Sequence, residues 1–277
     1  GMDKSEIFYK EFSKDADSGS LNDIKCHDCG DSAAKVAQML GIEDFVTTLS
    51  TACSSSANSF ITGARLLNAG VVERVVAGGV DALTYFTVSG FNSLRILDSE
   101  PCVPLDANRK GLNLGEAAAF AVLETEKTIS KTGNEPICEL KGWHNCAEAH
   151  HQTASSPEGD GAYSAMTGAL EKAELLPDQI DYINMHGTGT GNNDLSESIA
   201  VKRVFGDNLP LLSSTKGFTG HTLGAAGAVE AVISVISIKE KIIPGNLRFE
   251  TPIENSGLVP VVKTVTGKQI NNKQKKV

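Results

Sequence analysis

The sequence contains no run of about 18 consecutive apolar residues, the minimum for a helix that crosses a membrane. Its N-terminal stretch, GMDKSEIFYKEFSKD, has no apolar block of the kind that a signal peptide requires. A basic surplus is also missing, because 25 lysines and arginines stand against 34 aspartates and glutamates, a net charge of −9. The composition therefore predicts a cytoplasmic protein without a membrane partner or a general attraction to nucleic acid.

A disulfide framework is absent as well. Six cysteines are spread irregularly over 277 residues, at positions 26, 29, 53, 102, 138 and 146. This distribution is typical of reduced thiols in a reducing compartment. Cys26 and Cys29 have the C-x-x-C spacing of zinc and redox sites, but no second pair follows at zinc-ribbon spacing. The stretch HNCAEAHH, residues 144–151, has mixed spacing, so we predict no metal site.

Nucleotide-binding glycine patterns are incomplete. The segments AGGVDA, residues 77–82, and GAAGAVEA, residues 224–231, carry glycines at suggestive intervals. Neither forms a strand, a G-x-G-x-x-G turn and a helix followed by an acidic residue at the required distance. The sequence therefore predicts no nucleotide cofactor.

What the sequence does contain is an alternation of apolar β-type runs with longer helical patterns. The runs predict strands over 44–50, 74–80, 117–124, 180–186 and 209–214, and helices over 54–69, 162–175, 194–205 and 221–239. This alternation indicates a layered α/β fold with a largely parallel sheet, in which apolar strands are buried on both faces.

The order of strand, small-residue turn and long helix occurs at 44–69 and again at 209–239. We therefore expect two related α/β halves, residues 1–130 and 131–277, with catalytic groups meeting between them. The polar, glycine- and serine-rich stretch 144–162 predicts a surface loop, and we expect the polar and basic tail 263–277 to fray.

The stretch STACSSSANSF places Cys53 between a predicted strand and a predicted helix. Free backbone N–H groups and the positive end of the helix dipole favour a thiolate at such a position. A small, buried, structural cysteine is the alternative.

Two histidines lie in similar surroundings. His186 ends a predicted strand in NMHGTGTGNNDLSE, and His221 begins a predicted helix in SSTKGFTGHTLGAAGAVEA. Open α/β sheets bind ligands at the carboxyl ends of their strands, so we expect Cys53, His186 and His221 to belong to one site. A cysteine with two histidines is suited to acyl transfer.

Four segments, in their order and spacing, resemble the β-ketoacyl-[acyl-carrier-protein] synthases, the decarboxylating condensing enzymes of the thiolase superfamily. These segments are TACSSSAN, DANRKGLNLGEAAAFAVLE, NMHGTGTGNNDLSE and SSTKGFTGHTLGAAGAVEA, and the resemblance extends over nearly the whole chain. It implies a thiolase-like α/β fold.

The resemblance also implies a reaction. Cys53 would take an acyl chain from the phosphopantetheine of an acyl carrier protein as a thioester. His186 and His221 would hydrogen-bond the malonyl thioester carbonyl, help to expel carbon dioxide and stabilise the enolate. The partners would be acyl carrier protein with its malonyl and acyl thioesters, and a second copy in a homodimer. No cofactor of the protein's own is implied, because the carrier brings the phosphopantetheine.

Further residues are implied more weakly. Lys216 matches the family's lysine five residues before His221, with an exposed lysine as the alternative. The carboxylates Asp194, Glu197 and Glu230 would support this lysine and the histidines, although each could instead be a solvated surface residue. Phe91 would line the acyl pocket, with ordinary core packing as the alternative.

The sequence also departs from the family pattern. A Gly-Phe-Gly-Gly segment near the C-terminus supplies an oxyanion-hole donor in the family, beside the N–H of Cys53, and the sequence has no such segment. The family's first strands and helices are missing too, so we expect these 277 residues alone to acylate Cys53 slowly or not at all. A thiolase is one alternative, which HGTGT argues against. A non-catalytic partner resembling a chain-length factor is another, which Cys53 argues against.

Overall fold

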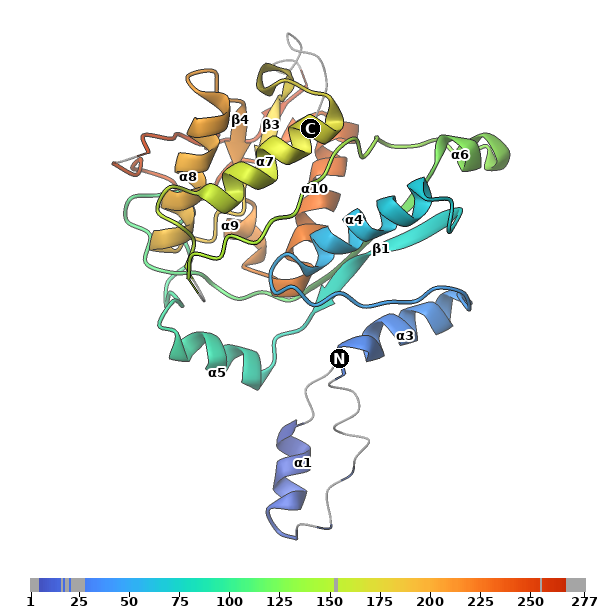
Figure 1. Ribbon diagram of the computed structural model, residues 1–277. Coiled ribbons are helices and arrows are strands. Elements are labelled where there is room, and N and C mark those ends of the chain that lie inside the picture. The colour runs from blue at the N-terminus through green and yellow to red at the C-terminus, as the bar shows by residue number, and fades with distance from the viewer. Residues whose placement is uncertain are drawn as a thin grey trace.

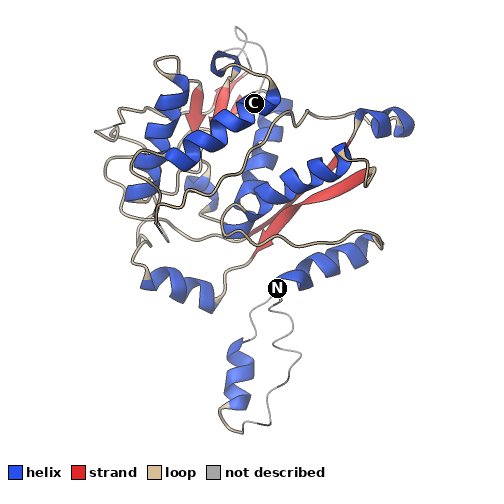
Figure 2. Ribbon diagram, in the orientation of Figure 1, coloured by secondary structure: helices blue, strands red, loops and turns tan. Residues whose placement is uncertain are grey.

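The structure, a computed structural model, describes residues 5–15, 17, 20, 28–151, 154–254 and 256–267. The described residues form three two-stranded sheets. Helices pack beside the sheets that contain β1 and β3–β4 (Figures 1 and 2). The α-helices are α1 (Ser5–Phe12), α3 (Cys29–Leu40), α4 (Ser55–Asn68), α5 (Tyr85–Ser93), α6 (Glu126–Thr132), α7 (Asp160–Ala173), α8 (Gly191–Phe205), α9 (Lys216–Thr219) and α10 (Ala226–Glu240). The strands are β1 (Arg74–Asp81), β2 (Ala117–Glu124), β3 (Tyr182–Asn184), β4 (Leu211–Ser213), β5 (Ile242–Ile243) and β6 (Val265–Thr266). The described residues also form two 3₁₀ turns, η1 (Pro177–Gln179) and η2 (Leu223–Ala225). No helix within the described ranges is long and apolar enough to span a membrane.

Strands β1 and β2 form an antiparallel pair that α4 and α10 cover on one face. Exposure alternates along β2, and Phe120 and Val122 on its other face are 42% and 57% exposed. The expected burial of this apolar strand on both faces is therefore wrong, because the period of two residues turns half of its side chains away from the covering helices.

Strands β3 and β4 pair in parallel beside α7 and α8. The main core cluster lies here and consists of Leu105, Met185, Val201, Phe205, Leu212 and Leu258. Within the described residues this is the parallel pair, whereas β1–β2 and β5–β6 are antiparallel. The predicted largely parallel sheet is therefore wrong as a description of these strand pairs.

Some of the other sequence predictions are confirmed and others are wrong. The helices expected over 54–69, 162–175 and 194–205 are present as α4, α7 and α8. Residues 44–50 form no strand, since the structure provides no partner to pair with them, and Phe45 and Val46 are about half exposed. The helix expected from residue 221 begins as α10 at Ala226, after η2.

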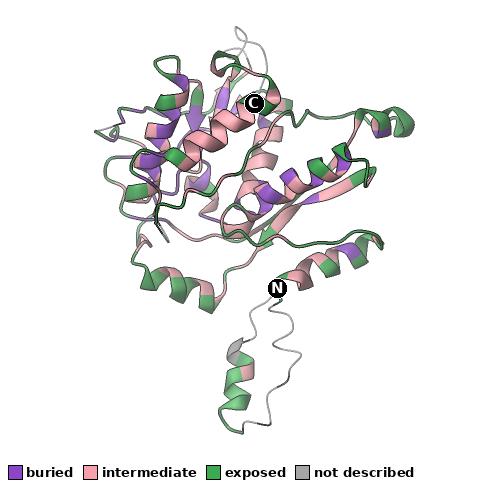
Figure 3. Cartoon of the chain, in the orientation of Figure 1, coloured by how far each residue is buried: buried purple, intermediate pink, exposed green. Residues whose placement is uncertain are grey.

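Five of the described α-helices were not predicted, namely α1, α3, α5, α6 and α9. Figure 3 shows buried residues along α4 and α8, whereas α5 exposes most of its length. Tyr85 and Phe86 on α5 are 81% and 80% exposed, so its apolar character does not reflect burial. Residues 144–151 and 154–159 are irregular, as predicted, and α7 begins at Asp160. Of the tail, residues 265–266 form β6, and 268–277 lie outside the described residues.

Candidate active site

Cys53 lies in a tight turn directly before α4. Ala52 has a left-handed backbone with φ of 52°, and the N–H of Ser55 donates to the Ala52 carbonyl over 3.1 Å. A non-glycine residue in this conformation is strained, and such strain is common where a side chain must be aimed at a reaction. The turn places Cys53 just ahead of Ser54, the N-cap of the helix.

The electrostatics of Cys53 differ from the expectation of a thiolate. Burial raises the pKa of the thiol, and this effect outweighs the opposing influence of the Lys216 charge and of the cysteine's own backbone N–H. The resting side chain is therefore the neutral thiol. The start of α4 does not by itself ionise it, because the site excludes too much water.

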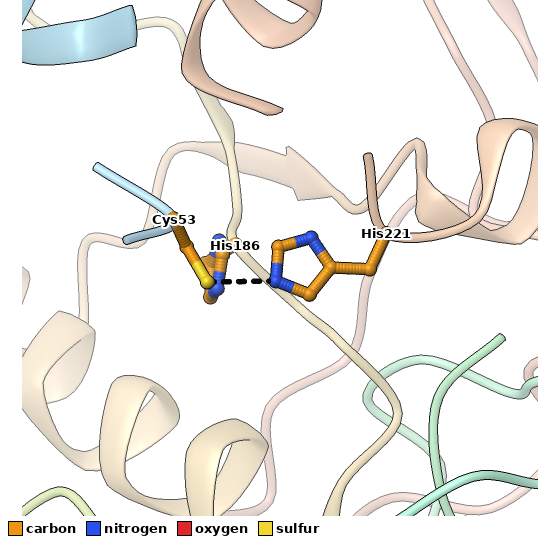
Figure 4. Close-up of side chains that lie close together, drawn as sticks. All are labelled: Cys53, His186 and His221. Carbon is orange, nitrogen blue, oxygen red and sulfur yellow. Dashed lines mark hydrogen bonds between the residues drawn. The ribbon is translucent and has the colours of Figure 1, made fainter. Parts of the chain in front are cut away.

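His221 is the nearest partner of the cysteine. Its Nε2 lies 3.1 Å from the Sγ of Cys53 (Figure 4). Its backbone is held by a bridge to Leu114, in which the His221 N–H donates to the Asn113 carbonyl over 2.7 Å. The N–H of Leu223 donates to Nδ1 of His221 over 3.3 Å. Since Nδ1 accepts, the neutral imidazole carries its proton on Nε2, which faces the sulfur.

His186 lies two residues past the end of β3, with its ring edge-on to His221 at 5.0 Å between centroids. Glu197 on α8 accepts the backbone N–H groups of His186 and Gly187, over 2.7 and 2.8 Å. Nδ1 of His186 lies 3.2 Å from Nζ of Lys216. An ammonium group only donates, so Nδ1 accepts here too and Nε2 carries the proton.

The HGTGT turn needs its glycines. Gly187 and Gly189 have φ of 38° and 83°. A Cβ at Gly187 would lie 2.5 Å from the Cβ of Ser214, and one at Gly189 would lie 2.7 Å from the Gly111 carbonyl oxygen. Any larger residue would therefore displace the turn that carries His186.

Lys216 follows β4 and is only 2% exposed, so the alternative of an exposed lysine does not hold. Its ammonium forms an ion pair with the largely buried Glu230 of α10. The fully buried Asp194 braces the turn instead, because its carboxylate accepts the N–H of Leu105 over 2.7 Å and that of Gly189 over 3.1 Å. The three predicted carboxylates thus hold three different parts of the site.

Both imidazoles are neutral at pH 7. Burial lowers the pKa of His186 well below its ordinary 6.5, and the charge of Lys216 adds to this effect. Burial and then Lys216 lower the pKa of His221 to about 3. Burial acts in the opposite direction on the carboxyls, raising the pKa of Glu230 and raising that of Glu197 to about 7. The site therefore holds two uncharged N–H donors next to one buried cation.

Sequence reasoning missed the clamp formed by Ser214 and Asn246. Asn246 is buried, accepts the Ser214 N–H over 2.9 Å and donates to the Pro104 carbonyl over 2.9 Å. The Ser214 hydroxyl in turn donates to the carbonyl of Gly187 over 2.7 Å. No periodicity or motif marks Asn246, because it lies in an irregular segment after β5.

Cys53, His186 and His221 are also the one group in the described part of the chain that is arranged to share a metal ion, with ligand atoms within 4.8 Å of one another. The hydrogen bonds do not fit that use. Both histidines accept at Nδ1 and hold a proton on Nε2, whereas a metal needs the Nε2 lone pair. The donor set therefore fits a hydrogen-bond-donating site better than a metal centre.

The remaining candidates lie elsewhere. Phe91 is partly buried on α5, and none of the hydrogen bonds and ring contacts described for the histidines involves it. Cys26 lies outside the described residues, and Cys29 begins α3. In the HNCAEAHH stretch, the Cys146 thiol donates to the Gly161 carbonyl over 3.2 Å.

Comparison with known proteins places this site in a family. The models named "Beta-ketoacyl synthase, N-terminal domain" and "Beta-ketoacyl synthase, C-terminal domain" match residues 11–128 and 137–250. The chain belongs to the β-ketoacyl synthase family. Nodulation protein E of Rhizobium leguminosarum bv. trifolii is 37% identical over 223 residues, which cover 79% of this chain and 55% of that protein. The 3-oxoacyl-[acyl-carrier-protein] synthase 2 of Staphylococcus aureus is 35% identical over 210 residues, 73% of this chain and 52% of that protein.

The chain therefore spans about half the length of these curated relatives. A solved structure of the ketosynthase ApeO in complex with its chain length factor ApeC, from Xenorhabdus doucetiae, superposes with a TM-score of 0.82 at 36% identity. That match covers 94% of this chain and 66% of the solved one. The β-ketoacyl synthases share the thiolase-like fold, and this chain has it.

Proposed function

We propose that the protein catalyses the decarboxylative Claisen condensation of an acyl thioester with a malonyl thioester, both delivered by an acyl carrier protein. The observation that supports this most directly is the 3.1 Å approach of His221 Nε2 to Cys53 Sγ. The edge-on ring of His186 beside it supplies a second neutral imidazole. A nucleophile and two N–H donors are the groups that this reaction needs.

In the first step, the Cys53 sulfur attacks the carbonyl carbon of the acyl thioester. A new C–S bond forms, the bond to the phosphopantetheine sulfur breaks, and the thiol proton leaves with that sulfur. The raised pKa of Cys53 means that the thiol must lose its proton as attack proceeds, and the nearby charge of Lys216 favours this loss. The acyl chain then remains on Cys53 as a thioester.

In the second step, a malonyl thioester enters and its carboxylate leaves as carbon dioxide. The electrons of the broken C–C bond move to the thioester oxygen, which becomes an enolate oxygen. The Nε2–H groups of His186 and His221 donate to this oxygen, where negative charge develops. Neutral donors suit this task, because they stabilise the enolate without protonating it.

In the third step, the enolate carbon attacks the acyl thioester on Cys53. A C–C bond forms, the C–S bond breaks, and the Cys53 thiolate takes a proton from water. The product is a β-ketoacyl thioester on the carrier protein. Lys216 serves the second and third steps by donating to Nδ1 of His186, and Glu230 offsets the charge of Lys216.

The relatives support the substrates and partners that we propose. The Staphylococcus aureus relative is named for 3-oxoacyl-[acyl-carrier-protein] synthesis, and the solved ketosynthase is described in complex with a chain length factor. We propose that this protein likewise acts on carrier-bound thioesters, in fatty acid or polyketide synthesis, and works as a dimer. The five cysteines within the described ranges are free, which supports a reducing, cytoplasmic setting.

One assay tests the proposal. The protein is incubated with a malonyl carrier protein and an acyl carrier protein, and carbon dioxide and the β-ketoacyl product are measured by mass spectrometry. We expect both, and Cys53→Ala should abolish the product while the control Cys138→Ala keeps it. Carbon dioxide without product would indicate decarboxylation alone. The absence of both carbon dioxide and the β-ketoacyl product would favour a non-catalytic subunit similar to a chain length factor.

A further inference from the structure

Asp81 is the last residue of β1 and lies in the AGGVDA segment, residues 77–82. The glycines of this segment let β1 approach the turn after His221. A Cβ at Gly79 would lie 2.6 Å from the Cβ of Ser56 and 3.0 Å from the carbonyl oxygen of Gly224. The end of β1 therefore packs directly against both α4 and η2.

At this contact the carboxylate of Asp81 accepts a hydrogen bond from the backbone N–H of Gly224, over 2.9 Å. The residue before Gly224 is Leu223, which has a left-handed backbone with φ of 50°. A leucine in this conformation is strained and persists only where its neighbours hold it. The charge-assisted bond from Asp81 to the adjacent peptide is one such restraint.

Leu223 connects this restraint to the reacting atoms. Its N–H donates to Nδ1 of His221, and that bond keeps the His221 proton on Nε2, 3.1 Å from Cys53 Sγ. A shift of the Leu223–Gly224 peptide would free Nδ1 to take the proton and would turn the ring away from the sulfur. Asp81 touches neither His221 nor Cys53 through any hydrogen bond described, so its effect passes through the turn.

We infer that Asp81 is a positioning residue for His221, which it holds in the Nε2–H form against Cys53 by anchoring the Leu223–Gly224 turn. The inference rests on the proposed function for its catalytic consequence. Its structural consequence, the tautomer of His221, can be measured without any activity.

A purely space-filling role would not need a carboxylate at this position. None of the ion pairs found among the described residues includes Asp81. Its negative charge is one of the influences that raise the pKa of the Cys53 thiol, which works against formation of the nucleophile. The carboxylate therefore carries a cost at the cysteine that its bond to Gly224 offsets.

The first measurement is the ring ¹⁵N signal of His221 in protein labelled with ¹⁵N-histidine. The chain has six histidines, and His221→Gln identifies the signal by its loss. We expect a single Nε2–H tautomer in the unaltered protein and in Asp81→Asn, whose side-chain oxygen still accepts from Gly224. In Asp81→Ala the signal should move toward a mixture of tautomers. An unchanged His221 signal in folded Asp81→Ala would overturn the inference.

The second measurement is decarboxylation of malonyl carrier protein by the same variants. We expect kcat to fall about 10- to 100-fold in Asp81→Ala with KM within about 2-fold, and Asp81→Asn to lose much less. Glu124→Gln is the matched control, because the Glu124 carboxylate accepts a hydrogen bond from Arg74 at the opposite end of the β1–β2 pair, away from His221. Equal losses in Asp81→Ala and Glu124→Gln would indicate general destabilisation and overturn the inference.

Circular dichroism establishes that each variant is folded. If Asp81→Ala does not fold, Asp81→Ser gives the same test, since its hydroxyl is too short to reach Gly224. If the unaltered protein releases no carbon dioxide, the proposed function fails. The His221 signal still decides the role of Asp81 in that case.

Discussion

Nζ of Lys216 lies 3.2 Å from Nδ1 of His186 and is ion-paired with Glu230 on its other side. One buried cation thus fixes the tautomer of an imidazole and is itself neutralised by a carboxylate. At His221 the backbone N–H of Leu223 makes the equivalent bond to Nδ1. Two different donors therefore produce the same result, an Nε2–H group on each histidine near Cys53.

Lys216→Met should separate stability from activity. The substitution leaves Glu230 buried without its partner, and breaking such a pair typically costs about 3–5 kcal/mol, which urea unfolding measures. The double variant Lys216→Met/Glu230→Leu should regain most of that stability. Neither variant should decarboxylate malonyl carrier protein at the original rate, since Nδ1 of His186 has lost its donor. Full activity in the double variant would contradict the role of Lys216.

Each histidine should contribute as a neutral donor. Replacing His186 or His221 by alanine removes one N–H and should slow decarboxylation roughly 100- to 1000-fold. His221→Gln should lose less, because its amide N–H can occupy a place close to that of Nε2. His150→Ala is the control, since His150 is exposed in the loop before α7 and should leave the rate unchanged. If glutamine proved as inactive as alanine, hydrogen-bond donation would not explain the role of His221.

The sequence predicted the parts of the site that depend on local pattern. The position of Cys53 before α4 follows from the helix signal after it, and that of His186 after β3 follows from the strand and turn signals around it. The parallel pairing of β3 and β4 then brings His186 and Lys216 together at the carboxyl end of the sheet, as the strand-end rule predicts.

Features that depend on distant partners could not be predicted. Whether residues 44–50 form a strand depends on a neighbouring strand, and nothing in their own pattern reveals that none pairs with them here. The thiol state of Cys53 depends on how much water the folded site excludes, which opposes the local influence of the helix start. Asn246 and Asp81 act through backbone groups far away in sequence, so no spacing marks them.

Metal chelation should have no effect on the protein. The hydrogen bonds at both Nδ1 atoms leave no lone pair on Nε2, so a metal would have to displace Lys216 and the Leu223 N–H. We expect one equivalent of zinc to leave the melting temperature unchanged and EDTA to leave decarboxylation unchanged. A melting temperature raised by zinc in the unaltered protein but not in His186→Ala/His221→Ala would show that the trio binds metal after all.

Glu197 should make stability depend on pH in a direction opposite to that of most paired carboxylates. Burial raises its pKa from the ordinary 4.5 to about 7, so in this interval the folded protein holds a proton that the unfolded chain has lost. The resulting stability is fully present below pH 4.5 and is lost as the pH rises through 7, by an amount on the order of 3 kcal/mol.

His221 acts in the opposite sense. Its pKa is lowered from 6.5 to about 3, so its contribution to the stability of the folded protein is lost as the pH falls below 6.5. Because His221 is common to both proteins, the difference in unfolding free energy between the unaltered protein and Glu197→Gln isolates the carboxyl. Urea unfolding at pH 4.5, 5.5, 6.5 and 7.5 should show that difference falling as the pH rises, whereas Glu171→Gln, on the exposed face of α7, should show a constant difference. A difference between the unaltered protein and Glu197→Gln that is constant or rises with pH would mean that Glu197 is ionised throughout and binds the N–H groups of His186 and Gly187 as a carboxylate.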